Sequence, residues 1–188
     1  MRLGKKVEFL AFLVVVFALV GCGPNTFPNN KSIEPLQRVV TQREAQYALE
    51  VALDLIGTPY IYGGRGPVSF DCSGLITYSY KTALKKENIF LIGSSYITDD
   101  ATMFDLFTYD LVPSPHEELQ EGDLVFISLD EERVTHGGMF IRWLDEEMFE
   151  FVNASSYFGE VTIDTWPIHG EKREQWYMGG GRLKVVIK

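Results

Sequence analysis

The order of two hydrophobic patterns along the chain constrains its fold more than any other feature. Apolar residues recur at three- and four-residue steps from Ala45 to Ile56, and a second helical pattern runs from about Cys72 to Leu84. From Asp123 the pattern changes to short β-rich runs, at 124–129, 138–143, 148–154, 160–165 and 183–187. Charged turns separate the first three runs, as in an antiparallel sheet with one wet face. Helices followed by strands predict an α+β fold.

Residues with capping roles mark the ends of these helices. Thr41 and Glu44 have the Thr-x-x-Glu spacing of a capping box, and a glycine followed by Thr58-Pro59 ends the same helix. Asp71 is placed to cap the second helix, which puts Cys72 in its first turn. Residues 88–118 fit neither pattern well, although 98–107 is compatible with a short helix.

Composition narrows the classes of function. The chain has 188 residues, 46% of them hydrophobic, which is typical of one globular domain. Its net charge of −9 argues against a nucleic-acid partner, because such proteins usually carry a basic patch. Two cysteines provide neither a disulfide framework nor a four-cysteine zinc site, so we expect no metal or other cofactor. The two thiols are therefore considered separately.

The first segment has the pattern of an export signal. Basic residues precede an unbroken apolar run, Phe9 to Val20, which is too short to span a bilayer. The run ends in Leu19-Val20-Gly21-Cys22, which resembles the bacterial lipobox, in which the cysteine becomes the lipidated first residue. Alternatives are a plain secretory signal, or a buried helix with a chance cysteine. We expect a signal peptide at 1–21, lipidation of Cys22, a tether at 22–40, and one catalytic domain at 41–188.

Lipidation would place the protein in the cell envelope. Several acyl chains on Cys22 would hold it stably to a membrane. Gly23, rather than Asp, follows the cysteine. By the resemblance to sorted lipoproteins, this favours the outer membrane facing the periplasm where the cell has one, and otherwise the outer face of the plasma membrane.

The second thiol is the candidate nucleophile. At a helix start, the unpaired N–H groups stabilise a thiolate and can also receive an oxyanion, although a lone cysteine is often only a small buried apolar residue. Of the three histidines, His136 alone opens a β-rich run with small residues beside it, unlike His116 and His169. Asn153 would orient its ring if the two runs pair as a hairpin. Alternatively, both are polar residues near turns with local hydrogen bonds.

Five motifs, taken together and in order, resemble the NlpC/P60 family of cell-wall cysteine peptidases. They span about Ala45 to Val186 and are Tyr60-Ile61-Tyr62-Gly63-Gly64, Asp71-Cys72-Ser73-Gly74-Leu75, 121–126, 136–141 and 153–156. The resemblance implies a papain-like α+β core with the cysteine helix packed on an antiparallel sheet. It also implies hydrolysis of amide bonds in peptidoglycan stem peptides, most often between γ-D-glutamyl and a diamino acid.

The resemblance also implies roles for single residues. Cys72 matches the nucleophile and His136 the general base. Asn153 stands at a third position that the family commonly fills with His, and its side-chain carbonyl can accept the imidazole N–H. Tyr60 matches the tyrosine whose hydroxyl lies near the oxyanion.

Substrate recognition is expected beside the nucleophile. Asp71 and Ser73 match residues that bind the free amino end of the stem peptide in relatives with that specificity, and an ordinary helix cap is the alternative for Asp71. Residues 88–118 are longer than in a minimal family member, which suggests an insertion that walls the substrate groove.

We therefore expect a lipid-anchored cysteine endopeptidase or amidase that acts on peptidoglycan through an acyl-enzyme. Its partners would be stem peptides and, through Cys22, a membrane. One alternative is an amidase or acyltransferase with a lipid or small-amide substrate. Relatives of that kind tend to place His before Cys, whereas Cys72 precedes His136 here. Another alternative is a non-enzymatic envelope-binding lipoprotein, which the presence of both residues disfavours.

Overall fold

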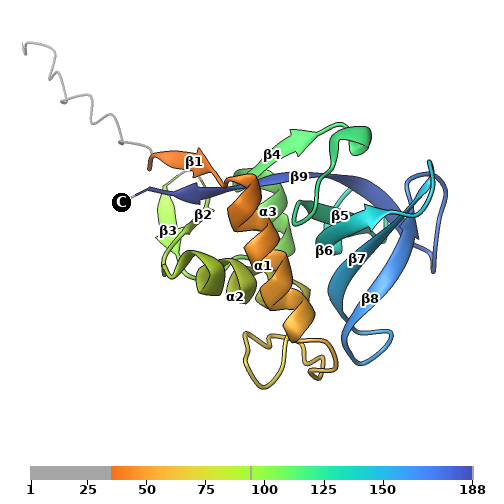
Figure 1. The fold of residues 1–188 in the computed structure, drawn as a ribbon, viewed down its shortest axis with the longest axis horizontal. Helices are drawn as coiled ribbons and strands as arrows, with labels where there is room; N and C mark the ends of the chain where they lie inside the picture. Colours follow the sequence, from red (N-terminus) through yellow and green to blue (C-terminus); the bar gives the residue numbers. More distant parts are fainter. Residues whose placement is uncertain (1–34, 94, 188) are drawn as a thin grey trace, which may run out of the picture. The chain divides into compact units, whose positions relative to one another are not determined.

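A seven-stranded antiparallel sheet forms the centre of the described chain (Figure 1). The computed structural model describes residues 35–93 and 95–187, so the expected signal peptide and Cys22 lie outside the described residues. Strand order is β1-β9-β5-β6-β7-β8, and β4 also pairs with β9. The strands are β1 (Gln37–Val39), β4 (Leu111–Ser114), β5 (Leu124–Ser128), β6 (Val134–Trp143), β7 (Met148–Ser155), β8 (Glu160–Pro167) and β9 (Trp176–Val186).

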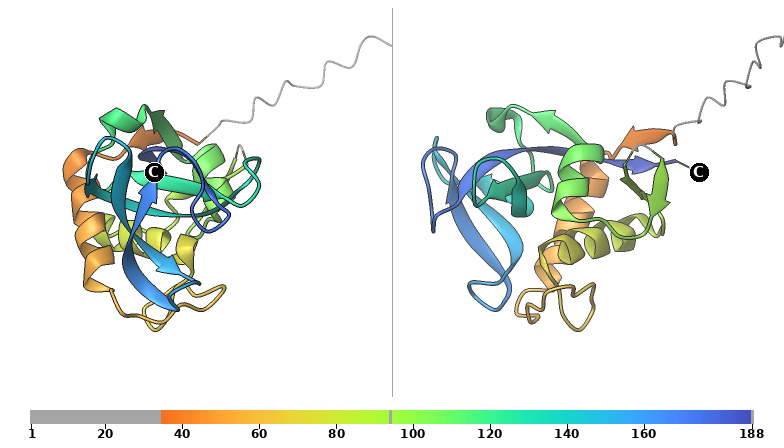
Figure 2. Two further views of the ribbon diagram at one scale, coloured as in Figure 1. Left: turned by 90° about the vertical axis from the view of Figure 1, so that its right-hand side faces the viewer. Right: turned by 180° about the vertical axis from the view of Figure 1, so that it is seen from behind.

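Three helices pack on this sheet, and Figure 2 shows them from two further sides. They are α1 (Gln42–Asp54), α2 (Cys72–Leu84) and α3 (Met103–Tyr109), and a short 3₁₀ turn, η1, spans His116–Glu118. α2 and α3 contact β6, while α1 and α2 contact β7. A separate hairpin joins β2 (Phe90–Ile92) to β3 (Tyr96–Thr98). The α+β fold with a cysteine helix on an antiparallel sheet is confirmed.

The two predicted helix starts are confirmed by their hydrogen bonds. The Thr41 side chain accepts the Glu44 N–H, and Glu44 in turn accepts the Thr41 N–H, which is the predicted capping box. Asp71 caps α2 by accepting the Gly74 N–H at 2.7 Å. Both contacts satisfy N–H groups that a helix start leaves without an intrahelical partner.

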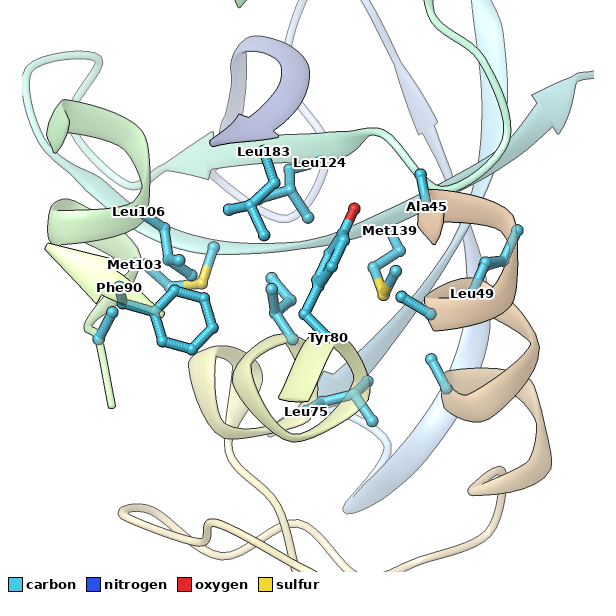
Figure 3. Close-up of a cluster of buried hydrophobic side chains, with 14 of the residues drawn as sticks. Ala45, Leu49, Leu75, Tyr80, Phe90, Met103, Leu106, Leu124, Met139 and Leu183 are labelled. Atoms are coloured by element: carbon cyan, nitrogen blue, oxygen red, sulfur yellow. The ribbon is translucent and has the colours of Figure 1, made fainter. Parts of the chain in front are cut away.

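The main core lies between the helices and the sheet (Figure 3). Tyr80 of α2 stands among apolar side chains from all three helices and the strands, and is fully buried. Its hydroxyl donates a 2.7 Å hydrogen bond to the Gly122 carbonyl, which ties α2 to the turn before β5. The labelled neighbours in the figure are Ala45, Leu49, Leu75, Phe90, Met103, Leu106, Leu124, Met139 and Leu183.

A second apolar cluster departs from the expectation of one wet face. Val125 and Ile127 of β5 pack in it with aromatic residues of β6, β7 and β8, while Leu124 and Phe126 belong to the main core. Because successive side chains of a strand point to opposite faces, both faces of β5 are covered and all five of its residues are buried.

Three expected boundaries need correction. Residues 37–39, assigned to the tether, form β1, which pairs with the distant strand β9. Residues 88–118 contain β2, β3, α3 and β4, and the helix expected within 98–107 begins at Met103 because Thr102 and Asp105 form a capping box. β6 begins at Val134, so His136 is its third residue.

Candidate active site

Cys72 occupies the first turn of α2, as predicted. Burial raises the pKa of its thiol to about 11, and the nearby Asp71 carboxylate acts in the same direction. The backbone N–H groups of Cys72 and Ser73 contact the sulfur and oppose this shift. The thiol is therefore protonated at neutral pH, and a base must remove its proton before or during attack on a carbonyl carbon.

The loop before α2 brings Tyr60 to the same place. The Tyr60 N–H bonds to the Gly159 carbonyl at 2.8 Å, and the Asp71 N–H bonds to the Gly64 carbonyl at 3.0 Å. Gly74 lets this loop lie against α2, because a Cβ there would collide with the Gly64 carbonyl oxygen. Burial and the neighbouring Cys72 raise the pKa of Tyr60, so its hydroxyl remains a hydrogen-bond donor.

β6 and β7 hold the candidate base and its orienting partner. His136 Nε2 lies 3.1 Å from Asn153 Oδ1, so the predicted pair is present. Since the amide oxygen only accepts, Nε2 carries the proton and Nδ1 keeps a free lone pair. Burial lowers the pKa of His136 below its usual 6.5, although the Asn153 bond opposes the shift. A Cβ on Gly138 would collide with the Val152 carbonyl oxygen and lie 3.0 Å from the Asn153 Cβ, so the glycine lets β6 lie close to β7 at this point.

Three of the predicted residues line one cleft of about 330 Å³: Tyr60, Cys72 and His136. β8 and the β8–β9 loop form the opposite wall of the cleft. There Arg173 Nη1 lies 2.5 Å from Asp164 Oδ2, and the Arg173 guanidinium carbon lies 4.3 Å from the centre of the Tyr157 ring. Asn153 is buried behind His136. Other lining residues are Leu129, Thr135, Ser155, Ser156, Trp166 and Gln175.

A second hollow of about 400 Å³ opens on the other side of Cys72, which lines both spaces together with Thr135. Asp71 and Ser73 lie in its wall, and α3 contributes residues to it. A substrate that crosses the thiol would therefore occupy both hollows, one on each side of the bond that reacts.

Comparison with known proteins identifies the family. The model of the NlpC/P60 family matches residues 57–179, which is more than half of the chain and includes Tyr60, Cys72, His136 and Asn153. The chain belongs to the NlpC/P60 family. The resemblance predicted from the five motifs is thus confirmed.

Two curated relatives of this NlpC/P60 chain are named as endopeptidases. Murein DD-endopeptidase MepH of Escherichia coli (strain K12) is 35% identical over 86 residues, which cover 45% of this chain and 28% of the relative. Probable endopeptidase p60 of Listeria grayi is 30% identical over 128 residues, which cover 68% of this chain and 20% of the relative. The chain thus matches only a minor part of each relative's length.

A solved NlpC/P60 structure has the same fold. NlpC1 from Trichomonas vaginalis superposes with a TM-score of 0.54 at 20% identity, over 79% of this chain and 47% of that one. At this identity the likeness shows the fold alone.

Asp71 makes more contacts than a helix cap requires in this NlpC/P60 domain. Oδ1 accepts the Gly74 N–H and the Ser73 hydroxyl at 3.1 Å, while Oδ2 accepts the Gly63 N–H at 3.0 Å and Arg65 Nη1 at 2.6 Å. A carboxylate has about four acceptor positions, and here all are filled. The predicted binding of a substrate amine by Asp71 and Ser73 stays a prediction, and it would require Arg65 to leave.

Sequence reasoning missed the charged residues that line both hollows. Arg65 is a single basic residue in a glycine-rich loop, and Asp164 and Arg173 come from two different segments that meet only in the fold. No motif or period singles out any of the three.

Two kinds of site are absent from the part of the chain that the structure describes. Within 35–93 and 95–187, no three His, Cys, Asp or Glu side chains are grouped so that they could hold a metal ion. In the same residues, no helix has the length and apolar character needed to cross a membrane.

Proposed function

We propose that the chain is a cysteine endopeptidase or amidase that hydrolyses amide bonds in peptidoglycan stem peptides through an acyl-enzyme. One observation carries the proposal. Cys72, in the first turn of α2, shares a cleft with His136, whose Nε2 is hydrogen-bonded to Asn153. The family membership and the curated relatives named as endopeptidases support the same reaction class.

The first half of the proposed reaction forms a thioester. The Cys72 sulfur attacks the amide carbon as its proton passes to His136 Nδ1, and an S–C bond forms. Negative charge develops on the carbonyl oxygen, where the Tyr60 hydroxyl and the N–H groups at the start of α2 are the available donors. His136 then gives the proton to the leaving nitrogen, and the C–N bond breaks.

The second half restores the enzyme. His136 takes a proton from water as the water oxygen attacks the thioester carbon. The S–C bond then breaks, the sulfur regains the proton from His136, and the released carboxylic acid ionises in water. Asn153 keeps the same imidazole nitrogen available in both halves by holding the proton on Nε2. The amide carries no charge, so it stabilises an imidazolium less than a carboxylate would.

The proposal also covers the amide bond that is cleaved and the place of the protein in the cell. The resemblance favours the bond between γ-D-glutamyl and a diamino acid. The lipobox-like Leu19-Val20-Gly21-Cys22 supports lipidation of Cys22 and an anchored position in the cell envelope. The anchor would restrict cleavage to wall within reach of the membrane.

Incubation with purified peptidoglycan fragments, followed by mass spectrometry, tests the chemistry. We expect the chain to release products that differ from the fragments by one hydrolysed amide bond, and Cys72→Ala to release none. The masses of the products identify the bond. Unchanged fragments, with a folded protein whose Cys72 can be alkylated, would reject the proposal.

A further inference from the structure

The hollow on the α3 side of Cys72 has an unusual charge for a chain that is acidic overall. Two arginines line it, Arg65 and Arg133, against a single acid, Asp71. The remaining lining residues that the structure describes are uncharged. The space beside the nucleophile therefore has two guanidinium groups in its wall, in a protein with a net charge of −9.

Arg65 is fixed between two acids. Its Nη1 lies 2.6 Å from Asp71 Oδ2, and its Nε lies 2.7 Å from Asp100 Oδ1. Asp100 comes from the 88–118 segment, so this segment helps to hold the guanidinium at the wall of the hollow. With Arg65 in place, the acceptor positions of Asp71 are filled, so this carboxylate offers none to a substrate ammonium.

Arg133 is the cation that remains available. Among the described residues, no carboxylate lies within ion-pair distance of its guanidinium. The neighbouring Asp130 carboxylate instead accepts backbone N–H groups of its own turn, including that of Arg133 at 2.9 Å. The guanidinium carbon lies 5.7 Å from the centre of the Phe104 ring in α3, a contact that positions the cation and leaves its N–H donors free.

We propose that this hollow selects the substrate by charge: Arg133 binds a carboxylate of the peptide, and Arg65 keeps out a free amino end. The inference rests on the proposed peptidase function and narrows its substrate class. The preferred substrate is a stem peptide whose amino end is acylated, as it is while still joined to a glycan strand, and which carries a free carboxylate next to the cleaved bond. Arginine suits this task because its planar donors match a carboxylate in a bidentate way.

Four synthetic stem peptides test the selection. They combine an acetylated or a free amino end with a carboxylate or a carboxamide beside the cleaved bond. For the full chain we expect kcat/KM to be about 10-fold higher with the carboxylate, as for one charge-assisted hydrogen bond, and higher with the acetylated end. Ratios between peptides do not depend on how much of a variant is folded.

Variants assign the two preferences to single side chains. Arg133→Gln should bring the carboxylate preference, which is the ratio of kcat/KM for the carboxylate peptide to kcat/KM for the carboxamide peptide, close to 1. Arg65→Gln should reduce the preference for the acetylated end. Arg142→Gln is the matched control, because Arg142 pairs with Glu150 and lines neither hollow. A carboxylate preference that is absent in the parent chain, or that survives Arg133→Gln, overturns the proposal.

Thiol labelling tests the charge beside Cys72 in an experiment that requires no peptidase activity. An anionic and a cationic methanethiosulfonate reagent are compared for their rates at Cys72, with peptide mapping to separate it from Cys22. We expect faster labelling by the anion, and loss of this bias in Arg133→Gln but not in Arg142→Gln. Biased labelling with no cleavage of any peptide would reject the peptidase function alone, whereas unbiased labelling would reject the charge selection.

Discussion

Cys72 and His136 form a neutral pair at rest. Burial raises the pKa of the thiol to about 11 and lowers that of the imidazole, so neither group carries charge at neutral pH. A neutral imidazole is able to accept a proton, and a neutral thiol has one to give. Proton transfer should therefore accompany the attack on the carbonyl carbon, rather than precede it as in a thiolate–imidazolium pair.

This pair makes the activity depend on pH in a defined direction. The pKa of His136 lies below 6.5, and a protonated ring accepts no proton. We therefore expect kcat/KM to fall as the pH drops through the lowered pKa of His136. Alkylation of Cys72 by iodoacetamide should keep rising with pH towards about 11. Both profiles can be measured on the full chain, with Cys72 resolved by peptide mapping. An alkylation rate that is already level at neutral pH would contradict the neutral pair.

Substitutions at His136 and Asn153 separate the proton carrier from its orienting partner. His136→Ala should lower kcat/KM by about 1000-fold or more, while Asn153→Ala should retain partial activity, lower by about 10- to 100-fold. Asn153→Asp should shift the acid limb of the pH profile upward, because a carboxylate stabilises the imidazolium. Equal activity in the parent chain and Asn153→Ala would remove Asn153 from the site.

At this scale the sequence predicts the reacting groups and misses their surroundings. Cys72, His136 and Asn153 stand in short motifs, so their types and order are visible before folding. Arg133 and Phe104 come from different loops and helices, and only tertiary packing brings the cation beside the ring. No local sequence pattern predicts a contact between residues so far apart in the chain.

At the scale of elements, local signals predict helices better than edge strands. Thr41 and Asp71 start α1 and α2 where expected, because a cap is made within one turn of the chain. β1 is missed, since its three residues pair with Val186, Val185 and Lys184 at the other end of the sequence. The structure of residues 88–118 is not predicted for a related reason. Strand β4 of this segment also pairs with β9, which is distant in the sequence.

Asp110 joins several of these elements and makes their stability depend on pH. Asp110 is the C-cap residue of α3 and is fully buried. Its carboxylate accepts a 3.0 Å hydrogen bond from the Leu91 N–H of β2 and a 2.6 Å hydrogen bond from Gln37 Nε2 of β1. Burial raises the pKa of its carboxyl from 3.8 to about 7. The folded state thus holds the proton more tightly than the unfolded state. This contribution to stability is fully present below pH 3.8 and is lost progressively as the pH rises from there to about 7.

Asp110→Asn removes the titrating group and keeps one acceptor oxygen, and the Gln37 amide can turn to face the new N–H₂ group. We expect the advantage of the variant in urea unfolding, relative to the parent chain, to be largest at about pH 8 and to shrink as the pH falls towards 3.8. Glu146→Gln, in an exposed turn, is the control for loss of one negative charge. A parent chain with no loss of stability between these pH values would contradict the assignment.

At the scale of the whole molecule, the main prediction is that a lipid on Cys22 anchors the protein to a membrane. Under the proposed lipidation, Cys22→Ser should move the protein from the membrane fraction to the soluble fraction after cell disruption, with peptidase activity on soluble fragments retained. Metabolic labelling with a fatty-acid analogue should mark the parent chain and not Cys22→Ser. An equal membrane share for both would argue against Cys22 as the attachment point.

The domain as a whole is well predicted, and its groove is not. One α+β domain of the NlpC/P60 family follows from patterns that each lie within a few residues. The two hollows beside Cys72 are built from segments near residues 60–73, 102–104, 133–135 and 155–175. Their shape and charge depend on how these segments meet, which is a property of the folded chain alone.

Strand β1 has a mechanical consequence for an anchored enzyme. It is three residues long, only partly buried, and lies at the edge of the sheet, where it pairs with β9 alone. When the membrane holds Cys22 and the groove holds the wall, tension enters the domain at β1, ahead of α1 and the core. Detachment of residues 35–39 would lengthen the tether by about 16 Å at roughly 3.3 Å per residue. The enzyme could then follow a receding substrate while its catalytic centre stays folded.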